Sequence, residues 1–375
     1  SEWNQAAEQI RMLEAGQEKG GSDFYTYRYL ATEGFLPGYN FPRLPLYAFV
    51  PGQAGSSSRS TYLQRARFLA IAEFGPLSLI YHEGRAYRVH KARLPASVKE
   101  EGGQKLATSP IWICDACGGG HPIVEPERCH VCDAPMAGVQ PVRNTLRIEN
   151  VETLPAERIT ANDEERQRQG FEIQTVFAWP RREGRVDVKR AAAADENGEI
   201  LLIDYSGGAS ISRLNKGLRR RANKSLFGFG INPVSGRWQK PPEEDGEADV
   251  QPDPDKTPPQ RVVPIVHDTK NAALLRLAGT PLSPEAMATV QHALSRGLDL
   301  VFQLEQGETL AEPVPERTNR RAFLAFEATE GGAGVLNRLI GDSGAIARIA
   351  RAALELMHYD HLDEAIAAAD PAQLN

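Results

Sequence analysis

The four cysteines lie within nineteen residues and form two Cys-x-x-Cys pairs, Cys114–Cys117 and Cys129–Cys132, which are separated by eleven residues. Each pair can present two thiolates to one tetrahedral metal ion, and four sulfurs leave no position open for water or substrate. The spacing therefore predicts a zinc ribbon over residues 111–136 that holds one structural Zn²⁺. A redox-active pair and an iron–sulfur cluster are the alternatives, and His121 and His130 are further candidate ligands.

A run of cations and aromatics lies between residues 205 and 240, a stretch without Asp or Glu. A positive strip beside exposed aromatic side chains is suited to a phosphate backbone with bases stacked alongside. The alternatives are a solvated helix face or a strip neutralised by the acidic residues that follow. The candidate nucleic-acid contacts are Arg213, Lys216, Arg219, Arg220, Arg221, Lys224, Phe229 and Trp238.

A glycine-rich turn, with Gly331, Gly332 and Gly334, stands between a strand-like run and a helix-like run. Backbone N–H groups at such a helix start can receive an anion, although tight strand-to-helix packing explains the glycines equally well. Glu327 and Glu330 lie beside this turn, and an acid/base pair there is the basis of a third hypothesis, a hydrolase.

Sequence motifs for common enzymatic chemistry are missing from the chain. It contains no GxxxxGK[ST] phosphate cradle, no HExxH zinc motif and no GxSxG nucleophile motif. We therefore expect that this chain alone is not an enzyme.

Composition indicates an ordinary globular protein of two or three domains, because 375 residues carry 41% hydrophobic and 25% charged side chains. The net charge of −6 argues against a protein that coats nucleic acid with its whole surface, but it allows a local basic groove. No run of 18 apolar residues exists, and the opening Ser-Glu-Trp-Asn has no apolar signal core. We expect no membrane association and a cytoplasmic protein, either processed or cut from a longer one.

The expected fold class is α/β (α+β), in three parts. Residues 1–58 are predicted to form a helix over 4–15 and an aromatic-rich, irregular connecting segment over 24–49. Residues 59–150 are predicted to form a small β domain with the zinc ribbon. Its strands are expected at 68–74, 77–81, 86–94 and 141–151, with a hairpin turn over His82–Arg85.

Residues 151–375 are predicted to form the third part, an α/β domain with an acidic linker at 241–260, where seven acids and six prolines prevent a core. His267 and Asp268 are expected to cap a strand end. Strands are predicted at 171–178, 200–207, 261–267, 298–304 and 321–327, and helices at 284–296, from Ala333 and at 344–358.

Several segments together resemble the C-terminal region of bacterial superfamily 2 DEAD/DEAH-box helicases with an MrfA-type zinc-binding (MZB) domain. The similar segments are residues 70–94, the zinc ribbon, 211–218, 267–277 and 322–336, and YRYLATEGFLPGYNFPRLPL resembles the segment after the second motor domain. The most specific pieces are the EFGP…Y…G…Y.V pattern and EATEGGAG. Such proteins occur in DNA repair and in DISARM-type anti-phage defence.

The sequence departs from this family where members often carry another CxxCG, because the comparable stretch Ile231–Gly236 has no cysteine. A second zinc site is therefore expected to be lost. The resemblance implies an accessory region that contacts DNA beside helicase motor domains, supplied in cis or by a partner subunit. The alternative is a zinc-stabilised protein-docking module of a defence or repair complex, in which segment 24–49 holds the partner.

Overall fold

The computed structural model describes residues 45–51, 61–94, 105–122, 124–156, 170–239, 257–279, 281–305, 307–328 and 332–359. Within these ranges the fold is mixed α+β, as expected, with many strands and four helices. The predicted helix over 4–15, most of segment 24–49 and nearly all of the acidic linker lie outside the described ranges. No helix in the described part of the chain is long and apolar enough to cross a membrane.

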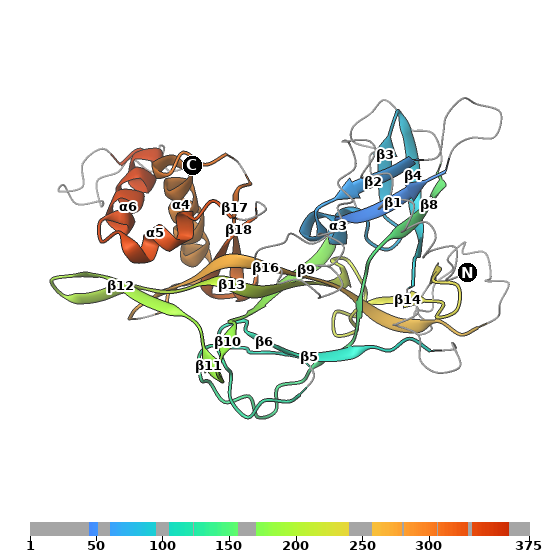
Figure 1. Cartoon of the computed structure of the whole chain (residues 1–375), viewed down its shortest axis with the longest axis horizontal. Helices are drawn as coiled ribbons and strands as arrows, with labels where there is room; N and C mark the ends of the chain where they lie inside the picture. The colour runs from blue at the N-terminus through green and yellow to red at the C-terminus, as the bar shows by residue number, and fades with distance from the viewer. Residues whose placement is uncertain are drawn as a thin grey trace.

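Two long antiparallel strands, β13 (Gly198–Leu218) and β16 (Gln260–Leu277), form the centre of the fold (Figure 1). They pair from Leu201 opposite Leu277 to Leu214 opposite Ile265, with a bulge between Ser206 and Ala209. They belong to an 11-stranded sheet. Strands β12 (Lys189–Asp195) and β9 (Phe171–Ala178) pair with β13, and β18 (Asn319–Glu327) pairs with β16 and with β17 (Thr309–Glu316).

Three helices cover one end of these strands: α4 (Pro284–Val301), α5 (Val335–Gly341) and α6 (Ala345–Leu356) (Figure 1). The helix α4 begins where the Ser283 hydroxyl accepts a hydrogen bond from the Ala286 N–H at 3.2 Å. The predicted strand at 298–304 is wrong, because Leu298 continues the apolar face of α4 into the core. The predicted helix at 344–358 is confirmed, since Ile349 and Ala353 are buried on one face of α6.

A second, five-stranded sheet lies near the other end (Figure 1), in the order β2 (Thr61–Arg65), β1 (Leu46–Val50), β8 (Val151–Pro155), β4 (Arg85–Ala92) and β3 (Leu79–His82). The predicted turn at His82–Arg85 is confirmed. Glu83 and Gly84 have φ of 46° and 72°, the left-handed pair that a two-residue hairpin turn needs.

The predicted strand at 68–74 is wrong, because this run forms the helix α3 (Arg67–Glu73). Phe68 and Ile71 are buried three residues apart while Leu69 between them is exposed, which is helical spacing rather than strand alternation. Residues 46–50 correct the expectation of an irregular connecting segment, because they form the strand β1.

The cysteine segment is built into the large sheet. Strands β5 (Ser109–Ile113), β6 (Gly120–Pro122) and β7 (Val142–Arg147) pair with one another, and β7 pairs in parallel with β16. Because β8 follows β7 directly and joins the five-stranded sheet, strand pairing crosses the boundary predicted near residue 150.

A tight loop joins the two sheets. It connects β14 (Phe229–Ile231) to β15 (Trp238–Gln239), and Gly236 donates to the Asn232 carbonyl at 2.8 Å. The Asn232 amide oxygen accepts from the N–H groups of Val234 and Ser235, so an asparagine shapes the turn in the stretch that lacks cysteine. The Ala92 N–H of β4 donates to the Gly236 carbonyl at 2.9 Å, which fixes one sheet to the other.

Candidate metal centre and the surrounding cationic surface

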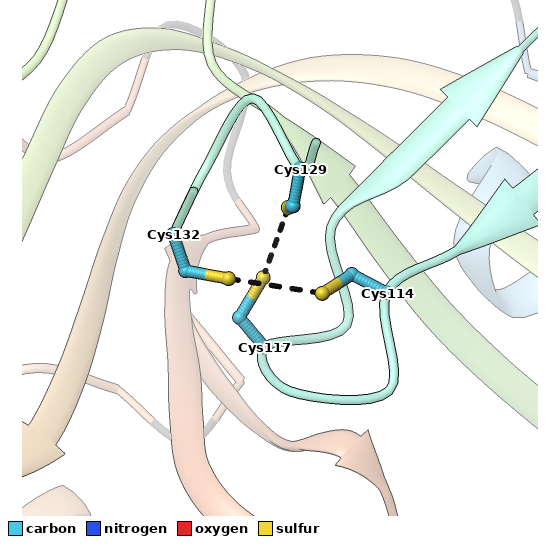
Figure 2. A group of neighbouring side chains, drawn as sticks. All are labelled: Cys114, Cys117, Cys129 and Cys132. Atoms are coloured by element: carbon cyan, nitrogen blue, oxygen red, sulfur yellow. Dashed lines mark hydrogen bonds between the residues drawn. The ribbon is translucent and has the colours of Figure 1, made fainter. Parts of the chain in front are cut away.

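The four cysteine side chains point toward one centre (Figure 2). Their sulfurs all lie within 4.8 Å of one another, with Cys114 to Cys132 at 3.7 Å and Cys117 to Cys129 at 3.6 Å. A tetrahedron of zinc–sulfur bonds of about 2.3 Å has edges of about 3.8 Å. The sulfurs are therefore spaced for one tetrahedral ion and are too far apart for disulfides, whose sulfurs are about 2 Å apart.

The two Cys-x-x-Cys turns share one backbone geometry. The first cysteine of each turn accepts a hydrogen bond at its carbonyl from the residue four positions later, Gly118 at 2.8 Å and Asp133 at 2.9 Å. Both of these residues have positive φ, of 77° and 61°. The N–H groups of Gly119 and Val131 also point at sulfurs, which is the arrangement that stabilises thiolate charge.

Electrostatics favour a cation at this centre. The hydrogen bond with the Cys114 thiol raises the pKa of Cys129 to about 12, and the neighbouring thiols raise the pKa of Cys117 above the ordinary thiol range. One thiolate therefore opposes the ionisation of the next. A divalent metal ion reverses this effect because each coordinated thiol is deprotonated. The four side chains fit a structural zinc ion and leave no vertex for a catalytic water.

His121 and His130, the further candidate ligands, lie beside the cysteines but outside the sulfur group that could hold an ion. Their rings meet edge to face with centroids 4.8 Å apart, and His121 is buried. Burial, together with the nearby His130, lowers the pKa of His121. The pair is therefore a packing contact between the two cysteine turns.

The basic run divides into anchored and exposed side chains. Arg213 donates to the Phe68 carbonyl at 2.8 Å and pairs with Glu312 at 3.0 Å, so it ties α3 to β17. Lys216 and Arg221 both pair with Glu172, at 3.4 Å and 2.6 Å. Each of these three predicted contacts therefore has a partner inside the fold, and their role in nucleic-acid binding stays a prediction.

Glu172 is the partner of two of these cations, and no sequence pattern connects it with the basic run. Burial alone would raise its pKa, but the guanidinium of Arg221 and the ammonium of Lys216 outweigh burial and hold the pKa of Glu172 below its usual range. Glu172 therefore stays ionised at neutral pH and keeps both cations in place.

Arg219, Arg220 and Lys224 are the members of the run that are exposed, and all three follow β13 on one loop. The Nε of Arg219 donates to the Phe171 carbonyl at 2.9 Å. Among the described residues, Arg220 and Lys224 have no carboxylate within ion-pair distance. Within this basic run, the positive charge that a ligand could reach is therefore on the loop over residues 219–224.

The two aromatics predicted to stack on bases lie at the junction of the two sheets. Trp238 is only 5% exposed and packs in the main core, and Phe229 is partly buried between Trp238 and Phe171. The Trp238 ring is therefore closed to solvent, and the Phe229 ring is covered in part by its two aromatic neighbours. They close the core at the sheet junction.

The buried side chain of Glu327 lies at the N-terminal end of α5. Its buried carboxylate accepts hydrogen bonds from the Asn271 amide at 2.8 Å and from the N–H groups of Gly334 and Leu336 at 3.0 Å each. The predicted anion-binding turn thus has the chain's own carboxylate as acceptor at Gly334. Glu330 and Gly331 lie outside the described residues. A buried carboxylate with three donors argues against the hydrolase hypothesis.

Comparison with known proteins gives weak structural similarity only. No protein-family model and no curated protein matches the chain. The crystal structure of the DUF1998 helicase MrfA bound to DNA is similar over 84% of this chain and 30% of its own, with 8% identity and a TM-score of 0.37. The MrfA structure described without DNA gives 10% identity and 0.31, and the complex with DNA and AMPPNP gives 8% and 0.28. The chain spans less than a third of the length of these helicases.

A second group of exposed cations was missed at the sequence level. The hairpin of β10 (Arg181–Arg182) and β11 (Arg185–Val186) carries three exposed arginines, of which Arg182 pairs with Asp187 at 2.8 Å. Arg181 lies close enough to the cysteine turns to lower the pKa of His130 after the larger effect of burial. The signal was visible as Arg-Arg-Glu-Gly-Arg, a basic run with a turn glycine.

Proposed function

We propose that this chain is a non-catalytic accessory region of an ATP-dependent DNA helicase, and that it binds DNA in repair or anti-phage defence. The observation that carries the DNA-binding part is the cationic loop, defined as residues 219–224, with Arg219, Arg220 and Lys224 exposed. The helicase part is supported by the sequence resemblance described above. The three-part division of the sequence into residues 1–58, 59–150 and 151–375 remains a proposal about ranges of the sequence, since both sheets extend across residue 150. The cytoplasmic location is also part of this proposal.

The cationic loop is held in shape before any ligand arrives. The Arg221 guanidinium donates to the Leu218 carbonyl at 3.1 Å and to the Lys224 carbonyl at 2.8 Å, so one side chain spans the loop. A loop that is already ordered loses less conformational freedom on binding. In this proposal Arg221 is a positioning residue, and its exposed neighbours contact phosphate.

Zinc has a supporting role in this proposal. The four thiolates would close the ion off from solvent, so it would supply rigidity to the cysteine turns rather than chemistry. The turn at Gly118 packs directly against Val314 and Pro315 of β17. The metal would therefore fix the cysteine turns against the large sheet.

The test of DNA binding is the salt dependence of affinity for a single-stranded oligonucleotide. Each phosphate contact on single strands contributes about 0.7 to the slope of log affinity against log salt. We expect Arg220→Ala with Lys224→Ala to lower the magnitude of this slope by about 1.4 and to weaken binding equally across sequences. Fluorescence anisotropy at several salt concentrations measures both effects.

A matched control is Arg317→Ala with Arg351→Ala, which removes two exposed cations elsewhere on the surface. The control should leave the slope unchanged. An equal loss in both double variants would mean that total charge, and not the cationic loop, governs binding. An unchanged slope in the loop variant would remove the DNA-binding proposal.

An apolar groove favours protein docking as the second candidate function. It lies between α4 and α6, has a volume of about 1000 Å³, and is lined in part by Leu300 and Leu356, which are 54% and 48% exposed. Large apolar side chains exposed together commonly mark a protein contact. The occupant that fits the resemblance is the helicase motor, in cis or as a partner subunit.

Docking predicts that Leu300→Asp with Leu356→Asp lowers co-elution with a helicase motor, added as a separate protein, by about tenfold or more, without changing DNA affinity. Size-exclusion chromatography with the purified motor measures it. Leu282→Asp, at an exposed leucine outside the groove, is the control. Co-elution that survives the double substitution would exclude this groove as the docking surface.

A further inference from the structure

We infer that one face of the five-stranded sheet is a stacking platform for the bases of single-stranded nucleic acid, formed by Phe49 and Tyr62 with Lys91 and Arg93 beside them. This inference rests on the proposed DNA-binding function and names a second contact surface for it. The surface differs from the cationic loop, which follows β13 in the large sheet.

The alternation of β1 places its aromatics on this face. Leu46, Ala48 and Val50 are buried in the core, so Tyr47 and Phe49 point to the opposite side of the strand. These two rings are the last aromatics of the aromatic-rich segment that the sequence singled out. The function proposed for the cationic loop makes no use of them.

The neighbouring strand β2 completes the aromatic group. Tyr62 lies directly opposite Phe49, with ring centroids 5.3 Å apart, and its ring meets Tyr47 edge to face at 6.4 Å. Tyr62 is 38% exposed although it has two aromatic neighbours. Part of an aromatic surface is therefore open to solvent on an edge strand.

Cations continue the same row across the sheet. Phe49 is opposite Glu152 on β8, and Glu152 is opposite Lys91 on β4. Lys91 and Arg93 both pair with Glu152, at 3.4 Å and 3.0 Å. The Arg93 guanidinium also lies over the Tyr62 ring, 5.9 Å from its centroid. A cation is therefore next to the exposed aromatic ring.

The balance of charge decides what this face would bind. Two paired cations share the single carboxylate of Glu152, and Arg88 is a further exposed cation on β4. A purely apolar partner would leave these charges unmatched, whereas a nucleic-acid strand brings both π-faces and phosphates. Aromatic side chains on a sheet face with cations alongside are how proteins bind bases without regard to sequence.

The experiment compares two oligonucleotides of equal length, one of thymidines and one of abasic sites, in anisotropy titrations of the full chain. The wild type is expected to bind the thymidine strand more tightly. Because one base–aromatic stack changes affinity by about tenfold, Tyr62→Ala should reduce this preference by about that factor while abasic binding stays the same. Tyr62→Trp should keep the preference.

Two further variants test whether a reduced preference for bases comes from lost apolar volume or from removing any exposed tyrosine. Tyr62→Leu keeps apolar volume without an aromatic face and should behave as the alanine variant does. Tyr81→Ala, at an exposed tyrosine on the opposite edge strand β3, should behave as the wild type does. A Tyr62→Leu chain that retains the full preference for bases would overturn the platform.

The outcomes separate this inference from the proposed function. Equal wild-type affinity for both oligonucleotides would overturn the platform and leave the cationic loop standing. The Arg220→Ala and Lys224→Ala pair should weaken both oligonucleotides by one factor and leave the preference intact. No binding of either oligonucleotide would overturn the platform and the proposed function together.

Discussion

Replacing Cys117 with serine is expected to reduce bound zinc from one ion per chain to nearly none and to unfold the segment between the two cysteine turns. The core of this segment is little more than three buried cysteines and Met136. In isolated zinc fingers the metal supplies about 10 kcal/mol or more of apparent folding free energy. Loss of one ligand should therefore lower the free energy of unfolding by several kcal/mol.

Metal analysis of the purified chain and limited proteolysis between the two turns measure this effect. In addition, cobalt(II) in place of zinc should give the visible absorption of tetrahedral thiolate coordination. Asp115→Asn, between two ligands but exposed, is the matched control and should retain the metal. A wild-type chain that is folded, protease-resistant and free of metal would show that packing alone holds the cysteine turns.

Glu327→Gln is expected to destabilise the protein by about 3 kcal/mol, even though the two side chains have the same shape. The carboxylate offers two oxygens to three N–H donors from Asn271, Gly334 and Leu336. A glutamine amide places its own N–H₂ against a donor, so at least one buried N–H group loses its acceptor. Chemical denaturation measures the change in the free energy of unfolding.

Glu355→Gln on the exposed side of α6 is the control for this substitution and should be neutral. A Glu327→Gln protein with unchanged stability but with lost hydrolytic turnover would restore the acid/base hypothesis. The same reasoning predicts that side chains larger than hydrogen are excluded at Gly332, where an added Cβ would meet the Glu327 carboxylate and the Asn271 amide.

Local patterns in the sequence were sufficient for the elements that carry their own signal. The turn at Glu83–Gly84, the strand at 171–178 and the amphipathic helix α6 were predicted because turn glycines, alternation and helical spacing are local properties. The short apolar run at 68–74 fits both periods, and only its packing against β13 and β16 makes it helical. The expectation that His267 and Asp268 cap a strand end is wrong, because both lie inside β16, whose length depends on pairing with β13.

The candidate site could also be predicted only where its geometry depends on local spacing. Four cysteines with two-residue spacing specify their own geometry, so their clustering could be predicted from the chain alone. The sequence pattern could not separate the anchored cations of the basic run from the exposed ones. Whether Arg221 is anchored depends on Glu172, which is 49 residues away in sequence. Exposure of Arg220 and burial of Trp238 are properties of the assembled sheet, and no spacing rule encodes them.

The length of β13 has a geometric consequence. Its 21 residues extend for roughly 65 Å at about 3.3 Å each, from the hairpin with β12 to the first residue of the cationic loop. β16 pairs with this strand from Leu201 to Leu214, and β9 pairs with it from Ser210 to Leu218, so hydrogen bonds support most of the span. The helical cluster and the cationic loop therefore lie at opposite ends of one long paired strand. A ligand bound at the cationic loop would therefore lie the length of β13 away from a partner bound to the helices.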